Sequence, residues 1–344
     1  MEYRDLGNTG IKVSEIGFGC GGNAGLMVKG TPDQQRDAIK RALDLGINYF
    51  DEAPDYGDGL SETNLGRVLK ELGVRPYITS KVEVRAENLE DIAGHIIRSL
   101  DGSLDRMGVD HVDVLQLHNG PVLDTPVLTG RSYTHLSLED YLRPGGALEG
   151  LQNAKDSGKA RSIGFITRGN DFDAAKQLID TGAFSVINAS VNLLNPSAGW
   201  KPAEMHVEHD YSGLLGYAAS QGVGACIYSP LAGGFLNDTA ITDGRFHPTA
   251  GNRRSAEVME VGFGQAQAFR FLSKNLCPGT QTEDHGLAEA AVRFVLSLDG
   301  VTSVLGGFSD ADQVAEVASF SGKGPLSKGN MEKIEAIWRS NFAS

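Results

Sequence analysis

The feature that most constrains the fold of this 344-residue chain is a regular alternation of short apolar segments with amphipathic segments of helical length. Eight segments have the character of buried strands, and helix-length segments separate nearly all of them. The expected strands are residues 16–19, 47–50, 77–81, 112–118, 161–166, 185–190, 224–228 and 303–305. Eight β–α alternations without doubled strands predict a closed parallel (β/α)8 TIM barrel, and we expect residues 1–344 to form a single domain.

Other elements surround this alternation. Residues 2–6 and 11–13 flank Gly7-Asn8-Thr9-Gly10 and predict an N-terminal β-hairpin. Helices are expected at 32–45, 61–72 with Ser61 as N-cap, 89–107, 148–157, 172–180, 213–221, 255–274, 282–298, 310–319 and 329–342. Residues 119–146 and 233–252 are too long for simple connections. The aromatic and imidazole side chains of Tyr133, His135 and Tyr141 predict that the first of these loops is an ordered lid over a substrate pocket.

Composition excludes several classes of protein. The net charge of −13 and the pI of about 5.1 give an overall field that repels nucleic acid and anionic membranes. Three widely separated cysteines suit neither a disulfide framework nor a cysteine-based metal site. No signal peptide and no apolar run of membrane-spanning length is evident. We therefore expect a cytoplasmic protein without a metal, a nucleic-acid partner or a membrane partner.

Polar residues end three of the expected strands. Asp51 follows the strand at 47–50, and Tyr56 lies on the loop just after it. Lys81 and His118 end the next two strands. Because functional groups in such barrels lie at the carboxyl ends of the strands, we expect these four side chains to meet.

The four side chains form a chemically coherent set. The phenol of Tyr56 is a poor acid at neutral pH unless its anion is stabilised. The ammonium of Lys81 can stabilise that anion, and Asp51 can hold the ammonium charged and oriented. With His118 as a second hydrogen-bond donor, the set predicts proton exchange with a substrate oxygen. A carbonyl that accepts this proton also needs a hydride, and amino acids supply none, so a nicotinamide cofactor is implied.

Over nearly its whole length the chain resembles the aldo-keto reductases. The matching segments, in register, are Gly17-Phe18-Gly19, Phe50-Asp51…Tyr56-Gly57, Ser61-Glu62…Leu65-Gly66, Thr79-Ser80-Lys81, Leu115-Gln116-Leu117-His118, Gly158-Lys159-Ala160-Arg161-Ser162-Ile163-Gly164 and Tyr228-Ser229-Pro230-Leu231. The resemblance implies an (α/β)8 barrel that binds NAD(P)(H). It also implies a catalytic tetrad of Asp51, Tyr56, Lys81 and His118, with Tyr56 as the acid/base.

The resemblance also implies a set of cofactor-binding residues. Gly19, Cys20 and Gly21 match the loop that touches the nicotinamide ribose, and Tyr228 matches the aromatic ring that stacks on the nicotinamide. Asp51 also belongs to the cofactor-binding set. The loop over the pyrophosphate corresponds to Ser229, Pro230, Leu231 and Gly233. Thr167 and Asn188 stand where the family holds the carboxamide, while Ile166 stands where the family usually has serine.

The loop after the eighth strand departs from the NADP-preferring pattern of the family. It contains Gly307, Phe308, Ser309 and Gln313, of which Ser309 and Gln313 fit a family variant. It also contains two carboxylates and no basic residue, so a 2′-phosphate would lack a charge partner. The sequence therefore favours NAD over NADP. As the alternative, a helix N-terminus at Asp310 could receive a phosphate through backbone N–H groups, and Arg253 or Arg254 could fold over it.

Two other classes of protein share parts of this pattern. A metal-dependent barrel hydrolase needs several histidines and carboxylates at strand ends, and only His118 clearly ends a strand. A cofactor-binding sensor resembling potassium-channel β subunits would retain the tetrad but turn over slowly. The expected substrate is a small carbonyl compound or alcohol, such as a sugar, with Trp200, Tyr133 and His135 as candidates to contact it. The sequence leaves open the direction of reaction and the oligomeric state.

Overall fold

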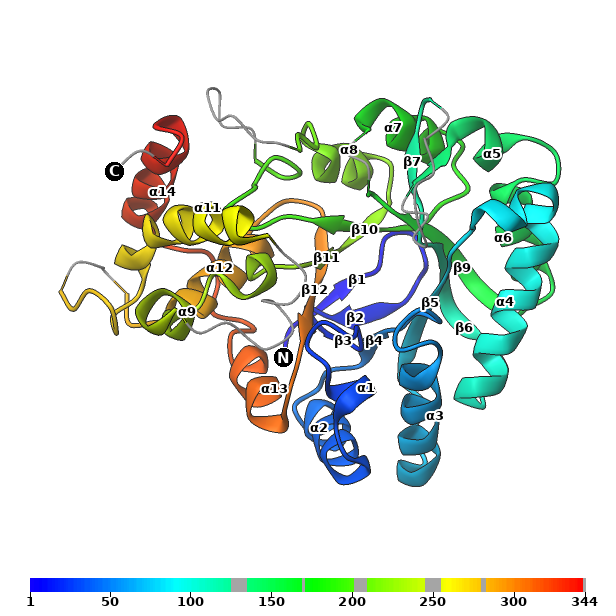
Figure 1. Cartoon of the computed structure of the whole chain (residues 1–344), viewed down its shortest axis with the longest axis horizontal. Coiled ribbons are helices and arrows are strands. Elements are labelled where there is room, and N and C mark those ends of the chain that lie inside the picture. Colours follow the sequence, from blue (N-terminus) through cyan, green and yellow to red (C-terminus); the bar gives the residue numbers. More distant parts are fainter. Residues whose placement is uncertain (125–134, 169–170, 201–208, 245–254, 280–282, 343–344) are drawn as a thin grey trace.

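The computed structural model describes residues 1–124, 135–168, 171–200, 209–244, 255–279 and 283–342. Eight parallel strands close into a barrel, in the order β10-β11-β12-β3-β4-β5-β6-β9 (Figure 1). These strands are β3 (Ile16–Gly19), β4 (Tyr49–Asp51), β5 (Tyr77–Val82), β6 (Val112–Leu117), β9 (Ala160–Ile166), β10 (Val186–Ser190), β11 (Gly224–Tyr228) and β12 (Val301–Gly307). The predicted (β/α)8 barrel is confirmed.

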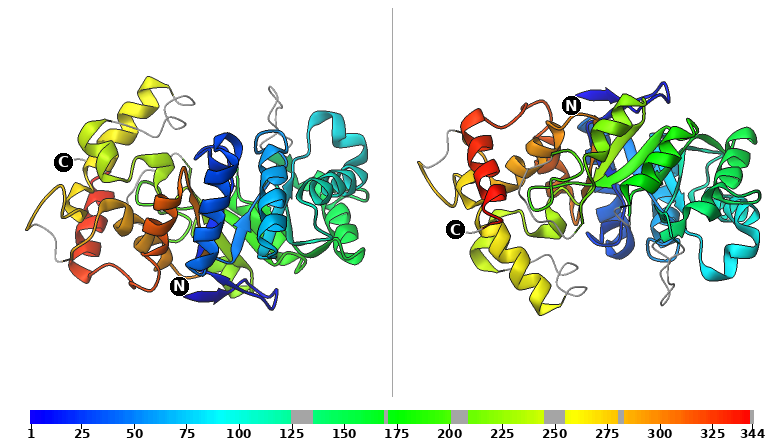
Figure 2. Two further views of the ribbon diagram at one scale, coloured as in Figure 1. Left: turned by 90° about the horizontal axis from the view of Figure 1, so that it is seen from below. Right: turned by 90° about the horizontal axis from the view of Figure 1, so that it is seen from above.

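Helices surround the barrel, as the two rotated views in Figure 2 show. They are α1 (Leu26–Lys29), α2 (Pro32–Asp44), α3 (Leu60–Leu72), α4 (Ile92–Met107), α5 (Leu138–Leu142), α6 (Ala147–Asp156), α7 (Phe172–Asp180), α8 (Leu214–Ser220), α9 (Asp238–Asp243), α11 (Ala256–Gln267), α12 (Leu287–Leu296), α13 (Ala311–Ala318) and α14 (Lys328–Arg339). Among the described residues, no helix has the length and apolar character needed to cross a bilayer.

The predicted N-terminal hairpin is also present. Strands β1 (Tyr3–Asp5) and β2 (Lys12–Ser14) pair antiparallel. Its turn lies against the amino ends of two barrel strands, since a Cβ on Gly7 would lie 2.4 Å from the carbonyl oxygen of Ser185 and 2.5 Å from the amide nitrogen of Gly224. The hairpin therefore covers the end of the barrel opposite to the carboxyl ends of the strands.

Local sequence signals explain where some helices begin, but Ser61 was assigned wrongly. Thr31 caps α2 in a reciprocal capping box with Gln34, followed by Pro32 at the first helical position. Helix α3, by contrast, begins at Leu60 with Gly59 as its N-cap. The hydroxyl of Ser61 instead donates to the buried carboxyl group of Glu52, 2.6 Å away.

Several predicted boundaries also differ from the structure. The helix expected at 89–107 begins as a 3₁₀ helix (Ala86–Asp91), and α4 proper starts where Asp91 caps it. The helix expected at 255–274 ends at Gln267, and the one expected at 282–298 begins at Leu287. Part of the expected loop at 233–252 is helical: a short 3₁₀ helix (Ala232–Gly234) and α9.

The long segment after β6 contains regular structure that the sequence did not reveal. Strands β7 (Gly120–Val122) and β8 (His135–Ser137) pair in a separate two-stranded sheet, and α5 follows directly. Tyr141 lies in α5, is buried, and donates a hydrogen bond to the carbonyl oxygen of Asn119. This part of the predicted lid is ordered, while Tyr133 lies outside the described residues.

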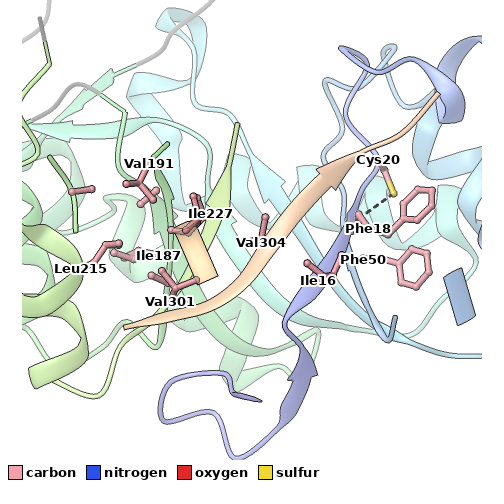
Figure 3. Close-up of a cluster of buried hydrophobic side chains, with 14 of the residues drawn as sticks. Ile16, Phe18, Cys20, Phe50, Ile187, Val191, Leu215, Ile227, Val301 and Val304 are labelled. Atoms are coloured by element: carbon pink, nitrogen blue, oxygen red, sulfur yellow. Dashed lines mark hydrogen bonds between the residues drawn. The ribbon is translucent and has the colours of Figure 1, made fainter. Parts of the chain in front are cut away.

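Buried apolar side chains form one large cluster, part of which is drawn in Figure 3. A second, smaller cluster contains Tyr49, Val114 and Val186. The sequence of β3 is apolar throughout because a parallel strand in a barrel is covered on both faces. Phe18 stacks on Phe50 at 5.2 Å between ring centroids and also contacts Phe308 at 5.0 Å. This packing places the loops after β3, β4 and β12 beside one another.

Candidate active site

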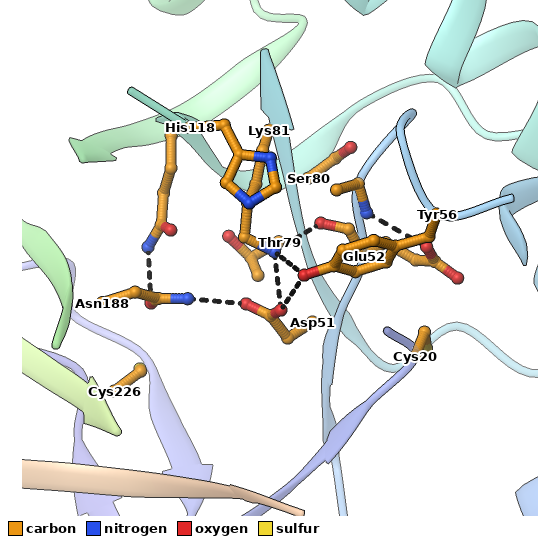
Figure 4. A network of polar contacts seen from close by, with 12 residues as sticks. Cys20, Asp51, Glu52, Tyr56, Thr79, Ser80, Lys81, His118, Asn188 and Cys226 are labelled. Atoms are coloured by element: carbon orange, nitrogen blue, oxygen red, sulfur yellow. Dashed lines mark hydrogen bonds and ion pairs between the residues drawn. The ribbon is translucent and has the colours of Figure 1, made fainter. Parts of the chain in front are cut away.

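Lys81 lies at the centre of a buried polar cluster at the carboxyl end of the barrel (Figure 4). Its ammonium nitrogen is 2.6 Å from Asp51 Oδ1 and 2.7 Å from the carbonyl oxygen of Glu52. Burial by itself lowers the pKa of a lysine, but the Asp51 carboxylate outweighs burial and the pKa of Lys81 is raised. The lysine is therefore a fixed positive charge.

The hydroxyl of Tyr56 completes this group. It lies 3.2 Å from the nitrogen of Lys81 and 3.5 Å from Asp51 Oδ1. The loop that carries Tyr56 turns sharply, with positive φ at Gly57, Asp58 and Gly59. These conformations favour glycine and tolerate aspartate, which explains the residues after the tyrosine.

The pKa of Tyr56 corrects one part of the sequence-based chemistry. Burial raises the pKa of the phenol, and the opposing effect of the Lys81 ammonium does not offset it. The net shift is upward, so Tyr56 is held as a neutral phenol rather than as an acidified one. This state suits a proton donor, and Lys81 remains beside the phenolate that donation leaves.

His118 lies at the edge of the same cluster. Its ring meets the ring of Tyr56 edge-on at 6.1 Å between centroids, and its Nδ1 lies 3.1 Å from Asp55 Oδ1. Burial lowers the pKa of His118, and the hydrogen bond to Asp55 partly opposes that shift. Four predicted residues, Asp51, Tyr56, Lys81 and His118, are thus brought together.

Asp51 also leads into a chain of buried amides. Its second oxygen, Oδ2, accepts a hydrogen bond from Asn188 Nδ2 at 2.9 Å. Asn188 Oδ1 in turn accepts from Gln116 Nε2 at 2.9 Å. Among the described residues, Gln116 Oε1 and Thr167 Oγ1 are buried and have no hydrogen-bond partner. Unpaired buried polar atoms at the mouth of a barrel indicate a polar ligand.

The predicted cofactor loops after β3 and β12 lie side by side. Gly19 pairs in register with both Gly307 and Asp51, and the amide of Cys20 donates to the carbonyl oxygen of Asp51. A Cβ on Gly21 would lie 3.6 Å from the Tyr56 ring. This arrangement places the loop after β3, the first of the predicted cofactor loops, directly against Tyr56 and Asp51.

The loop after β12 has its own internal order. Phe308 is buried against Phe18. Ser309 donates its hydroxyl to the carbonyl oxygen of Ala24, and its amide donates to Gln313 Oε1. Ser309 and Gln313 therefore hold one another and the first loop together.

The loop after β11 is strained where the cofactor residues were predicted. Tyr228 ends β11, and Ser229 has a φ of 56°. After Pro230 and Leu231, Gly233 has a φ of 69° inside the short 3₁₀ helix. Positive φ at a non-glycine residue such as Ser229 is backbone strain that the surrounding fold must hold, and such strain clusters at ligand-binding sites.

Three carboxylates gather beside the loop after β12. Burial raises the pKa of Glu316 on α13, and the nearby carboxylates of Asp238 and Asp310 raise it further. Asp310 also caps α13 by accepting from the amide of Gln313. The helix terminus considered as a phosphate site is thus surrounded by negative charge.

Four residues near the site were missed from the sequence. Glu52 is fully buried one residue after Asp51, and burial raises its pKa to about 8. Asp55 directly precedes Tyr56, and Gln116 lies two residues before His118, so both positions could have been found by face and spacing. Arg168 faces Tyr228 and His118, as its electrostatic effect on both shows. No sequence pattern marked it.

The candidate substrate residues have mixed placements. Trp200 packs on Trp338 of α14 at 6.2 Å between ring centroids, which is a core contact. His135 begins β8, and burial lowers its pKa. Arg253 and Arg254, like Tyr133, lie outside the described residues. Within the described ranges, no group of three or more His, Cys, Asp or Glu side chains is arranged to hold a metal ion.

Comparison with known proteins gives a consistent result. Residues 15–339 match the family model described as "Aldo/keto reductase family". L-Galactose dehydrogenase of Arabidopsis thaliana is 28% identical over 344 residues, covering 98% of this chain and 94% of that protein. A probable voltage-gated potassium channel subunit beta of Oryza sativa is 26% identical over 356 residues, covering 99% and 97%.

A solved structure shares the fold. The glycerol dehydrogenase of Gluconobacter oxydans superimposes with a TM-score of 0.72 at 20% identity, covering 98% of this chain and 95% of that one. At this identity the similarity shows a common barrel.

Proposed function

Because the chain belongs to the aldo/keto reductase family, we propose that it is a nicotinamide-dependent oxidoreductase that interconverts a carbonyl compound and its alcohol. The observation that carries this proposal is the buried contact of Tyr56 with Lys81, 3.2 Å between hydroxyl and ammonium, with Asp51 on the far side of the ammonium. This arrangement places a proton donor beside a fixed positive charge at the open end of the barrel.

In the proposed mechanism, each of the chain's residues has a role. The bound nicotinamide supplies or accepts the hydride. Tyr56 donates its proton to the carbonyl oxygen and Lys81 stabilises the resulting phenolate. Through its Nε2, His118 hydrogen-bonds the same substrate oxygen: the neutral imidazole accepts from the alcohol hydroxyl, and the imidazolium donates to the carbonyl oxygen. Asp51 keeps Lys81 charged and in place, because an ammonium buried without a partner is costly.

The residues present fit a dinucleotide along one edge of the barrel mouth. Tyr228 would stack on the nicotinamide, and Ser229, Leu231 and Gly233 would cover the pyrophosphate. Ser309 and Gln313 would hold the adenosine end. The unpaired Gln116 Oε1 and Thr167 Oγ1 support the presence of a polar group at the other end.

We propose NAD as the cofactor in preference to NADP. Burial raises the pKa of Glu316, and the carboxylates of Asp238 and Asp310 lie close enough to raise it further. A 2′-phosphate among these three carboxyl groups would meet like charges. A ribose 2′-hydroxyl carries no such penalty and can donate to a carboxylate.

For the substrate we propose a small hydroxylated aldehyde, ketone or sugar lactol. The related plant protein is named for L-galactose oxidation, and the mouth of this barrel carries Arg168 and Tyr228 as polar groups that can bind hydroxyls. We also propose that the chain acts as one domain in the cytoplasm.

The test combines binding and turnover. NADH and NADPH are titrated by fluorescence quenching, and oxidation of the preferred cofactor is followed with a panel of aldehydes, ketones and sugars. The Tyr56→Phe variant should bind cofactor as wild type does and lose turnover by about 10²–10⁴-fold. Full activity in that variant would refute the proposed proton donor.

A second candidate is a cofactor-binding sensor, because a rice potassium channel subunit beta is similar over nearly the whole chain. A sensor would bind the dinucleotide tightly but show no substrate-dependent oxidation across the panel. Sustained turnover by wild type that Tyr56→Phe abolishes would exclude it.

A further inference from the structure

One amide oxygen in the barrel has no hydrogen-bond partner in the described part of the chain. Gln116 lies on β6 with its side chain fully buried. Its Nε2 donates to Asn188, 2.9 Å away, while its Oε1 accepts from no group. A buried carbonyl oxygen without a donor is costly, so this atom is placed to receive a ligand.

The directions of the hydrogen bonds among Asp51, Asn188 and Gln116 explain why Gln116 Oε1 cannot take the place of Nε2 against Asn188. As the ion-pair partner of Lys81, the carboxylate of Asp51 only accepts hydrogen bonds. Asn188 must therefore present its amide nitrogen to Asp51 and its oxygen to Gln116. Gln116 must in turn present its nitrogen to Asn188, which leaves Oε1 unpaired. Rotating either amide would set two donors or two acceptors against each other.

A second unpaired atom lies next to the same asparagine. Thr167 follows β9, its side chain is buried, and its backbone amide donates to the carbonyl oxygen of Asn188 at 2.9 Å. Its hydroxyl oxygen has no partner among the described residues. The unpaired acceptor Gln116 Oε1 and the hydroxyl donor of Thr167 therefore flank Asn188. A primary amide, with an N–H2 donor and a C=O acceptor, matches that pair.

We propose that Gln116 Oε1 accepts a hydrogen bond from the carboxamide N–H2 of the nicotinamide, and that the Thr167 hydroxyl donates to the carboxamide oxygen. The inference rests on the proposed function, because it takes the ligand to be a nicotinamide dinucleotide. It adds Gln116 to the cofactor-binding residues and gives Asn188 a different role, as the link between Gln116 and Asp51.

Neighbouring residues support this placement of Gln116. A Cβ on Gly164 of β9 would lie 3.1 Å from Gln116 Cγ, so the glycine makes room for the glutamine. Gln116 also pairs in register with Lys81 on β5. The carboxamide would thus be joined to the tetrad through Gln116, Asn188 and Asp51, which fixes the nicotinamide ring relative to Tyr56.

The test uses an analogue that lacks only the amide nitrogen. In 3-acetylpyridine adenine dinucleotide, a methyl group replaces the carboxamide NH2 while the carbonyl oxygen remains. Dissociation constants are measured by calorimetry for this analogue and for the parent dinucleotide, NAD⁺ or, with the phosphorylated analogue, NADP⁺, whichever binds more tightly. Wild type should prefer the parent by about fivefold to tenfold, the factor expected for one neutral hydrogen bond.

Two variants separate the two contacts. Gln116→Met should reduce the preference for the parent dinucleotide to about onefold. Thr167→Val should weaken parent and analogue equally, because both retain the carbonyl oxygen. Gln152→Met on α6 is the matched control and should bind both ligands as wild type does.

The outcomes separate this inference from the proposed function. Equal affinity of wild type for parent and analogue, or an unchanged preference in Gln116→Met, would overturn the assignment of Gln116. A protein that binds neither dinucleotide would instead overturn the proposed function. Circular dichroism of each variant checks that lost binding does not reflect unfolding.

Discussion

The carboxylate of Asp55 lies 3.1 Å from Nδ1 of His118, although the two residues stand on the loop after β4 and at the end of β6. The residue immediately before Tyr56 therefore controls the ring that faces Tyr56. Because a carboxylate accepts only, it holds the proton of the neutral imidazole on Nδ1. The protonation of Nε2, toward the substrate, then depends on whether the ring is charged.

Replacement of Asp55 by asparagine should lower the pKa of His118 further. Burial lowers this pKa in wild type, Lys81 and Arg168 add to the effect, and Asp55 is the group that opposes it. Loss of that carboxylate should shift the pH at which the imidazolium disappears downward by about one unit. Imidazole nitrogen shifts in NMR spectra and the pH profile of carbonyl reduction would both report the change.

Asp58→Asn is the control for that experiment. Asp58 lies on the same loop and is exposed, so this variant removes the same charge without touching His118. If Asp55→Asn and Asp58→Asn gave the same His118 titration, the Asp55 contact would have no specific effect.

Two lysine–aspartate pairs with the same distance between nitrogen and oxygen should contribute very differently to stability, because one pair is buried and the other is exposed. Lys81–Asp51 and Lys40–Asp44 both measure 2.6 Å, but the first pair is 1% and 5% exposed and the second 60% and 52%. Lys81→Met leaves a buried carboxylate without its ammonium and should lower the free energy of unfolding by about 3–5 kcal/mol. Lys40→Met should cost less than about 1 kcal/mol.

Urea unfolding of the two variants at pH 7 measures this difference. The amide of Asn188 also donates to Asp51, so Asn188→Ala in the Lys81→Met background should cost further stability. Equal losses for Lys81→Met and Lys40→Met would contradict the expectation.

Glu52 should make the protein less stable as the pH rises. Burial raises the pKa of Glu52 to about 8, above its ordinary value of 4.5. The native state therefore holds this proton over a pH range in which the unfolded state has released it. Stability is fully present below about pH 4.5 and is lost progressively up to about pH 8, by on the order of a few kcal/mol.

Glu52→Gln should remove this dependence. The amide oxygen can accept from the backbone N–H of Ala53, and the amide nitrogen can donate to Ser61 Oγ, whose hydroxyl can donate to the carbonyl oxygen of Cys20. The variant should gain stability relative to wild type between pH 6 and pH 9 in denaturant titrations. A parallel pH dependence in both proteins would show that Glu52 is ionised at neutral pH.

A charge change at Glu316 should alter cofactor preference. Glu316 lies with Asp238 and Asp310 beside the loop that carries Ser309 and Gln313. Glu316→Lys replaces a repulsive charge with an attractive one and should tighten NADPH binding by about tenfold or more, with little effect on NADH. Glu332→Lys on the exposed face of α14 is the control, and an equal effect there would mean only net charge matters.

The spacing of polar residues along the chain was enough to predict much of the site. Asp51 ends β4, Lys81 is the next-to-last residue of β5 and His118 directly follows β6, and a parallel barrel brings all strand ends to one rim. Hydrogen bonds beyond each strand end hold these positions, for example from the amide of His118 to the carbonyl oxygen of Val82. Local pattern and barrel geometry together therefore sufficed to bring the tetrad residues together.

Hydrogen bonds between side chains that lie far apart in the sequence could not be predicted in this way. Gln116 and Asn188 lie 72 residues apart in sequence, and Asn188 and Asp51 lie 137 apart. Ser61 matched an N-cap by type and position, yet its hydroxyl serves Glu52 because that carboxylate is buried beside it. A residue's local preference gives way when a buried polar group needs a partner.

The sequence by itself determined the barrel, the strand or following loop that carries each tetrad residue and the family to which the chain belongs, because periodicity and short motifs are local properties of the chain. Tertiary structure decided which charges are desolvated and which atoms remain unpaired. Burial reversed the expected shift of the Tyr56 pKa. The series of hydrogen bonds from Asp51 through Asn188 to Gln116 leaves Gln116 Oε1 unpaired among the described residues. Both results depend on the distance and solvent exposure of groups far apart in sequence, which only the folded chain sets.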